Sequence, residues 1–343
     1  MRTTILRVND NVLLVGEGNF SFGVSLIKLN LNINLTATCY ESSIIFESGL
    51  QNADYLKAKG ARVILGVDAT KLMEHPSMDS EEFDKIIFNF PHVGGKMKID
   101  RNRELLKGFF LSSQTLLKPK GVVLVSLCNG QGGTPMDNPQ RRWDDSWQIV
   151  EMAAHGNFLL TGVEPFSFAE FPDYTCVGYR SLEKGFNNKS SLVHILQKAE
   201  KPNLINIAPR VRIDSSFKNN LELENTISWK QLIAKFADKD VSEKSEILSI
   251  HSQSHSFHIT FLVRTDFTEI NFYMTLFKFV GKIIDNVEFL GLYKFPNSTK
   301  VTRTYNISYR STCYPLYRSR VIDIHKNIIT NILEDHLNVV VTK

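Results

Sequence analysis

The stretch Asn11-Val-Leu-Leu-Val-Gly-Glu-Gly-Asn-Phe-Ser21 decides the fold of this chain. A short apolar run ends in a Gly-x-Gly turn, and residues 20–29 then carry apolar side chains at helical spacing. Glycine adopts backbone conformations that a Cβ would oppose, so the chain can approach a ligand closely at this turn. The stretch therefore predicts a strand, a ligand-accessible turn and a helix.

The same unit recurs along the first 200 of the 343 residues. Apolar strands are predicted at 35–40, 61–67, 83–88 and 122–127, and helices at 44–59, 102–117 and 147–154. Apolar strands that alternate with amphipathic helices favour a parallel sheet covered on both faces. Two further strands, 159–168 and 191–197, follow each other with no helix between them. A hairpin that closes a parallel sheet is typical of the α/β, Rossmann-like fold of class I methyltransferases.

A second periodic region follows a polar segment. Residues 201–252 are rich in Asn, Lys and Glu and contain one short helical pattern near 229–236, so we interpret them as a connector. From residue 253 to 343 the predicted order is βαββαβ, which is the α+β, ferredoxin-like arrangement. We therefore predict two domains, 1–200 and 253–343, joined by 201–252.

Composition excludes several classes of protein. Hydrophobic residues make up 43% and charged residues 22%, a balance typical of soluble globular proteins. The four cysteines are widely spaced, so neither a zinc site nor a disulfide framework is expected. The first ten residues contain no apolar signal core, and we expect an intracellular protein of the cytoplasm or the nucleolus, with no membrane partner. Oligomeric state is not predictable.

The net charge of +4 lies entirely in the last part of the chain. Residues 1–252 hold 29 Lys and Arg against 29 Asp and Glu, whereas residues 253–343 hold 11 against 7. A basic region beside a neutral one suggests a domain that binds an anionic polymer, although a surplus of four charges is also compatible with ordinary surface variation.

Residues after three successive strands predict a nucleoside cofactor. The turn contributes Gly16, Glu17, Gly18 and Phe20, and acidic residues follow the next two strands. The first of these, Glu41, could accept the ribose hydroxyls of the cofactor, while Asp68 could reach its adenine amino group. Either carboxylate alone could instead be a solvated charge or a helix cap. Their order after the glycine turn favours the cofactor site.

The fourth strand ends in a segment that could hold a flat substrate. Amino-methylating enzymes often carry Asn or Asp followed by prolines and an aromatic residue here, and this chain has Asn89-Phe90-Pro91-His92. Asn89 and Pro91 are the residues expected near a target base, with Phe90 available for stacking. His92 is the nearest candidate general base. The alternative is a structural proline loop with a buried phenylalanine.

Three segments are similar, in order and spacing, to one known family. They are 16–22, Gly66-Val-Asp-Ala-Thr70 and Phe83-Asp-Lys-Ile-Ile-Phe-Asn-Phe-Pro-His92. The family is that of the fungal large-subunit rRNA uridine-N3 methyltransferase, and the resemblance covers roughly residues 10–198. It implies S-adenosylmethionine as methyl donor and uridine N3 in RNA as the target. The chain departs from the family pattern at Asn19, where Asp is usual, and at 171–174.

The last part of the chain contains Lys294-Phe-Pro296, Lys300, Tyr305-Asn-Ile-Ser-Tyr-Arg310 and a following helix over 318–325. With these segments, residues 255–341 resemble the ferredoxin-fold anticodon-binding domain of phenylalanyl-tRNA synthetases. The pairing of the two regions resembles an animal protein family named for that domain. The resemblance implies tRNA or other RNA as a partner, with aromatic side chains for stacking and cations for phosphates. The residues expected to carry RNA binding are Tyr293, Lys294, Lys300, Arg303, Tyr309 and Arg310.

The sequence therefore predicts an S-adenosylmethionine-dependent RNA methyltransferase with a C-terminal RNA-binding domain. The first region points to rRNA as substrate and the second to tRNA, so this choice stays open. The main alternative is a non-catalytic tRNA-binding protein that keeps a Rossmann-like scaffold, because fold does not establish activity. A nicotinamide dehydrogenase is disfavoured, since Ser21 replaces the third glycine of a dinucleotide site.

Overall fold

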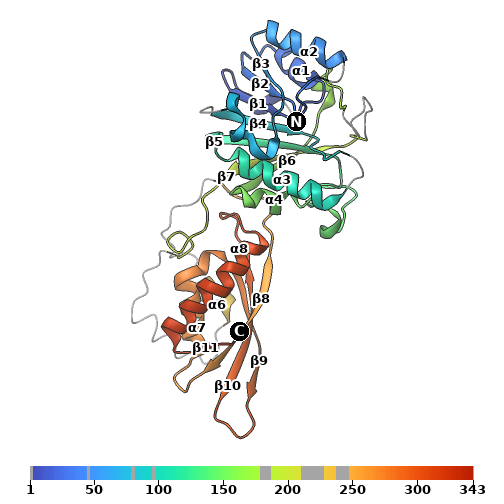
Figure 1. Ribbon diagram of the computed structural model, residues 1–343. Helices are drawn as coiled ribbons and strands as arrows, with labels where there is room; N and C mark the ends of the chain where they lie inside the picture. Colours follow the sequence, from blue (N-terminus) through green and yellow to red (C-terminus); the bar gives the residue numbers. More distant parts are fainter. Residues whose placement is uncertain are drawn as a thin grey trace. The chain divides into compact units, whose positions relative to one another are not determined.

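The computed structural model describes residues 3–44, 47–78, 82–94, 98–177, 187–209, 228–236 and 247–342 (Figure 1). The chain forms two compact units. The N-terminal unit comprises 1–200 with 247–251, and the C-terminal unit comprises 201–246 with 252–343.

The N-terminal unit is built on a seven-stranded sheet in the order β3-β2-β1-β4-β5-β7-β6. The strands from β3 to β5 are parallel, whereas β7 is antiparallel to both β5 and β6, which forms the closing hairpin. This order confirms the Rossmann-like prediction. The strands are β1 (Asn11–Val15), β2 (Asn34–Thr38), β3 (Arg62–Ile64), β4 (Phe83–Asn89), β5 (Leu117–Leu127), β6 (Phe158–Pro165) and β7 (Leu192–Lys198).

Helices cover both faces of this sheet (Figure 1). In β1, Leu13 and Val15 face one core and Val12 and Leu14 the other, because successive side chains of a strand point to opposite faces. The first core also contains side chains of α3 (Ile99–Ser113) and α4 (Ile149–His155), and the second those of α1 (Ser21–Lys28) and α2 (Glu47–Ala58). Both faces of every central strand are thus buried, which explains their unbroken apolar runs.

The C-terminal unit is a four-stranded antiparallel sheet in the order β11-β8-β10-β9. Its elements follow the predicted βαββαβ order, and the last helix contains a π-helical turn in its middle. Helix side chains pack on one face of the sheet with Phe261, Tyr305 and Ile307. The elements are β8 (His255–Val263), α7 (Glu269–Val280), β9 (Ile284–Lys294), β10 (Val301–Tyr309), α8 (Arg318–Asp323), η8 (Ile324–Ile329), α9 (Thr330–Leu337) and β11 (Val340–Val341).

Part of the segment predicted as a connector, 201–252, is packed on the C-terminal unit. Helix α6 (Trp229–Phe236) buries Trp229 and Leu232 in the core of that unit, together with Ile207. Burying one such large side chain contributes about 1.5–3 kcal/mol, so these contacts hold the segment in place. The connector prediction was wrong here because a polar average composition conceals a few apolar anchors.

The end of the same segment belongs to the other unit. The Ile250 N–H donates a hydrogen bond to the Leu160 carbonyl of β6 at 2.8 Å, and 247–251 is part of the N-terminal unit. Residues 210–227 and 237–246 of the predicted connector lie outside the described residues.

Candidate active site

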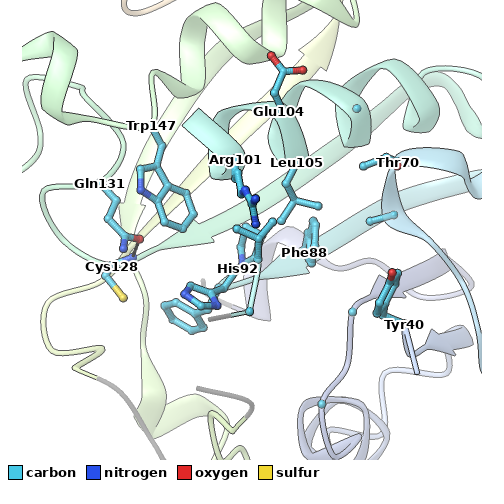
Figure 2. Close-up of a pocket in the computed structure, with 18 of the residues that line it drawn as sticks. Tyr40, Thr70, Phe88, His92, Arg101, Glu104, Leu105, Cys128, Gln131 and Trp147 are labelled. Carbon is cyan, nitrogen blue, oxygen red and sulfur yellow. Dashed lines mark hydrogen bonds between the residues drawn. The ribbon is translucent and has the colours of Figure 1, made fainter. Parts of the chain in front are cut away.

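A cavity of about 1320 Å³ opens at the carboxyl ends of the parallel strands (Figure 2). Small-molecule sites typically occupy about 300–1,000 Å³, so this cavity has room for more than one ligand. The predicted site residues that line it come from the loops after β1, β2, β3 and β4: Gly16, Gly18, Glu41, Asp68, Pro91 and His92. The strand order brings these loops together, because the ends of parallel strands meet at one edge of the sheet.

The glycine turn after β1 fits against the end of β4. Gly16 has a φ of +67°, and a Cβ added to it would lie 2.6 Å from Cε2 of Phe88. A Cβ on Gly18 would lie 3.0 Å from Cγ2 of Val177. Gly16 is therefore required both for space and for conformation, whereas at Gly18 the space alone is tight.

Glu17 and Phe20 do not line the cavity, which corrects their assignment as cofactor contacts. The Glu17 carboxylate is buried and accepts a hydrogen bond from the Gly23 N–H at 3.3 Å, in the first turn of α1. Burial raises the pKa of this carboxyl to about 7. Phe20 is fully buried with a φ of +60°. Both residues shape the start of α1, because the turn directs their side chains inward.

Two carboxylates face the cavity from neighbouring strands. Glu41 follows β2 and accepts the thiol proton of Cys39 at 2.9 Å. Asp68 follows β3, and its Oδ1 accepts the N–H and the hydroxyl of Thr70 at 2.8 and 2.7 Å. Asp68 is therefore a cap of the short helix η2 (Ala69–Glu74) as well as a cavity residue. Its second oxygen has no hydrogen-bond partner among the described residues.

Two helix residues that the sequence reasoning missed hold the neighbouring loops. Gly108 of α3 lies so close to η2 that a Cβ would be 2.7 Å from Thr70. Asn102, also of α3 and fully buried, accepts the Val93 N–H at 3.0 Å and so fixes the loop after β4. Both positions could have been recognised in the sequence. A glycine inside a helix and an asparagine on its apolar face each destabilise the helix, so their presence indicates a requirement of the tertiary structure.

Asn89 lies beneath the loop after β4, away from the cavity. Its Oδ1 accepts the Ser126 hydroxyl at 2.6 Å, while its Nδ2 is buried without a partner among the described residues. The prediction that Asn89 contacts a substrate directly is thus not supported by its position, since its side chain joins β4 to β5. His92 does line the cavity, and partial burial lowers its pKa below the ordinary value of 6.5.

A glycine-rich loop after β5 forms another wall of the cavity and was not predicted. Cys128, Asn129 and Gln131 line the cavity, and Gly130 has a φ of +83°. The buried carboxylate of Asp137 holds this loop by accepting the N–H groups of Gly130 and Thr134, both at 2.8 Å. The sequence pattern that could have predicted this loop is the presence of three glycines within 130–133, shortly after a strand.

The six RNA-binding candidates of the C-terminal unit do not share one surface. Tyr309 is fully buried, and its hydroxyl hydrogen-bonds Nδ1 of His325 at 2.7 Å, so it cannot stack on a base. Arg303 lies 5.3 Å from the ring centroids of Phe267 and Phe289. These contacts correct the predictions for both residues: strand alternation turns Tyr309 toward the helices, and the aromatic rings hold Arg303.

Arg310 is exposed, but it follows β10 at the end opposite to Lys300. A strand rises about 3.3 Å per residue, so the two cations are roughly 30 Å apart. Three candidates remain together at the β9–β10 turn: Tyr293, Lys294 and Lys300, all exposed. Tyr293 packs edge-on against Phe295, with the ring centroids 5.0 Å apart. This turn is the part of the predicted RNA face that stays accessible.

Within the described ranges, no group of three or more His, Cys, Asp or Glu side chains is arranged to hold a metal ion. None of the helices in the described part of the chain is long and apolar enough to cross a membrane. The four cysteines are free thiols.

Part of the N-terminal unit is similar to a known protein family. Residues 13–178 match the model of a family described as rRNA (uridine-N3-)-methyltransferase BTM5-like. The ferredoxin-fold anticodon-binding domain-containing protein 1 homolog of Mus musculus is 46% identical over 192 residues, which cover 55% of this chain and 31% of that protein. The Homo sapiens protein is 44% identical, with the same coverage. The chain thus spans less than a third of the length of these two relatives.

The 25S rRNA (uridine(2634)-N(3))-methyltransferase of Saccharomyces cerevisiae is 25% identical over 221 residues. The match covers 48% of this chain and 65% of the yeast protein.

Proposed function

We propose that this chain, which carries a BTM5-like family domain over residues 13–178, is an S-adenosylmethionine-dependent RNA methyltransferase acting on uridine N3 of rRNA. One observation carries the proposal. The family-matched segment contributes the glycine turn, both strand-end carboxylates and the Pro91-His92 loop to a single cavity. The fold itself brings these strand ends together, and what favours a ligand is their chemistry: a glycine turn without side chains beside carboxylates that face a cavity.

The part of the cavity lined by Gly16, Gly18, Glu41 and Asp68, here called the donor half, suits a nucleoside with an adenine base. Glu41 and Asp68 supply acceptors for ribose hydroxyls and for an exocyclic amino group, and Gly16 and Gly18 keep the turn free of side chains. When bound there, S-adenosylmethionine supplies a methyl group already activated on a sulfonium. The protein then acts mainly by aligning the reactants, because proximity and orientation alone can lower an activation free energy by roughly 7–11 kcal/mol.

The acceptor half offers a group for the proton that uridine N3 must lose. Methylation at N3 would require the N3 proton to leave, and His92 is the cavity residue that would accept it. A lowered pKa keeps the His92 imidazole neutral at pH 7, the form that accepts a proton. Phe90 and Pro91 line the same region and present flat apolar surface to a base.

The C-terminal unit would supply a second set of RNA contacts, separate from those to the reacting base. Lys294 and Lys300 are exposed cations beside the exposed Tyr293 ring, a combination suited to phosphates and a stacked base. Recognition of tRNA instead of rRNA by this unit is the main alternative. The yeast relative is named for rRNA, whereas the mouse relative is named for an anticodon-binding domain.

The test has two stages with the full chain. Calorimetry with S-adenosylmethionine should show binding in the micromolar range or tighter, and transfer of labelled methyl groups should then be measured on total rRNA and on total tRNA. Digestion of labelled RNA to nucleosides should yield 3-methyluridine. Absence of donor binding by the folded protein would overturn the methyltransferase proposal in favour of a non-catalytic RNA-binding protein. Labelling of tRNA alone would overturn the choice of rRNA.

A further inference from the structure

Two arginines, Arg101 and Arg141, line the cavity together with the carboxylates. Arg101 projects from the first turn of α3 toward the cavity, in the middle of Figure 2 with His92, whereas Tyr40 and Thr70 lie to the right. Arg141 comes from the loop after β5 and also lines the cavity. A Cβ on Gly130 would lie 3.1 Å from its Nε, so the glycine leaves space for this guanidinium.

Among the residues that the structure describes, these two charges have no ion-pair partner, in contrast to the carboxylates beside them. Asp100 and Glu104 also line the cavity, but each has a cation of α3 within ion-pair distance: Arg103 at 3.2 Å and Lys107 at 3.7 Å. Among the described residues neither Arg101 nor Arg141 forms a hydrogen bond or an ion pair.

The cavity therefore contains both carboxylates and guanidiniums. Glu41 and Asp68 lie at the strand ends, whereas Asp100 and Glu104 stand on α3 with a cation partner each, so Arg101 and Arg141 are the lining cations that keep their charge available among the described residues. A neutral base would need no cation, whereas a nucleotide within a chain brings a phosphate on each side. Guanidiniums form bidentate, charge-assisted hydrogen bonds with phosphates, which makes arginine the suited residue for this task.

We propose that Arg101 and Arg141 bind the RNA phosphates that flank the target nucleotide and so position its base in the cavity. This inference rests on the proposed function and assigns substrate contacts to the N-terminal unit, separate from those of the C-terminal unit. The two arginines are positioning residues: they hold the backbone while other groups act on the base.

Arg142 provides a matched control. It is exposed and adjacent to Arg141 in the sequence, but its guanidinium is paired with Asp144 and it does not line the cavity. Loss of Arg142 should therefore leave RNA binding nearly unchanged, although it removes the same formal charge from the same loop.

The experiment measures binding of a uridine-containing RNA hairpin to the full chain between 50 and 200 mM salt, with S-adenosylmethionine affinity measured in parallel. For R101A/R141A we expect at least tenfold weaker RNA binding and a salt slope shallower by about 1.4, since each single-stranded phosphate contact contributes about 0.7. R101K/R141K should restore most of the slope, because the charge returns. R142A should resemble the wild type, and donor affinity should be the same in all variants.

A wild-type slope in folded R101A/R141A, or an equal loss in R142A, would overturn the inference while leaving the methyltransferase proposal intact. A hairpin with neutral methylphosphonate linkages beside the target uridine gives a second measurement that does not depend on protein folding. The wild-type protein should bind it at least tenfold more weakly than it binds the unmodified hairpin. Wild-type protein that binds neither donor nor RNA would instead remove the proposed function, and the inference with it.

Discussion

Gly16 and Phe88 are in such close contact that a Cβ on the glycine would lie 2.6 Å from the phenylalanine ring. Gly16→Ala should therefore displace the turn after β1 and weaken S-adenosylmethionine binding at least tenfold. Gly60→Ala is the control: Gly60 has a similar φ of +84°, but no atom lies within 4 Å of the added Cβ. The positive φ should cost each variant about 1–2 kcal/mol of folding free energy, and Gly16→Ala should lose more because of the contact with Phe88. Calorimetry should show that only Gly16→Ala affects the donor.

Asp68 has two separable roles. Asp68→Asn retains an oxygen that can accept the Thr70 N–H but removes the negative charge. We expect donor affinity to fall roughly ten- to hundredfold, the equivalent of about 1.5–3 kcal/mol, with little change in melting temperature. Asp68→Ala should also lose the cap of η2, a further cost of about 1 kcal/mol in stability. Equal melting temperatures for the two variants would argue against the capping role.

If His92 accepts the N3 proton, the rate of methyl transfer should decrease at acidic pH. Its pKa is lowered by burial, so the neutral imidazole predominates above pH 6.5 and is lost as the pH falls through the lowered pKa. Single-turnover rates should thus be constant near neutrality and decline well below pH 6.5. His92→Gln should reduce the rate about 10²- to 10⁴-fold and abolish this decline, while donor affinity is retained. An unchanged acid limb in the variant would assign the proton to another acceptor.

Tyr309 should affect stability and leave RNA contacts unchanged. Tyr309→Phe removes the hydroxyl that hydrogen-bonds His325 and should lower the free energy of unfolding by about 0.5–1.5 kcal/mol. Tyr309→Ala should cost about 3–5 kcal/mol because it leaves a cavity in the core of the C-terminal unit. Thermal melting measures both changes, and RNA affinity of the folded Tyr309→Phe variant should equal that of the wild type.

Trp229 should be required for an isolated C-terminal unit. A fragment of residues 201–343 includes the buried Trp229 and Leu232, whereas 252–343 exposes the surface they cover. The longer fragment should melt at a higher temperature, and Trp229→Ala within it should remove most of the difference. Similar melting of both fragments would mean that α6 contributes little to this unit.

Local sequence patterns were sufficient to predict both folds. Alternation of strands and helices gave the parallel sheet with its closing hairpin, because burial on both faces requires unbroken apolar strands. The same reasoning placed Gly16, Glu41, Asp68 and His92 at one site. Residues that directly follow parallel strands must meet at the same edge of the sheet, whatever their side chains do.

Only the tertiary structure decided where individual side chains point. Glu17 and Tyr309 were expected to meet ligands but are buried, because turn geometry and strand register set the direction of each Cβ. Arg101 and Arg141 are forty residues apart and carry no local signal. They reach one cavity because α3 and the loop after β5 are packed against neighbouring strands of one sheet, a long-range relationship that no local pattern contains.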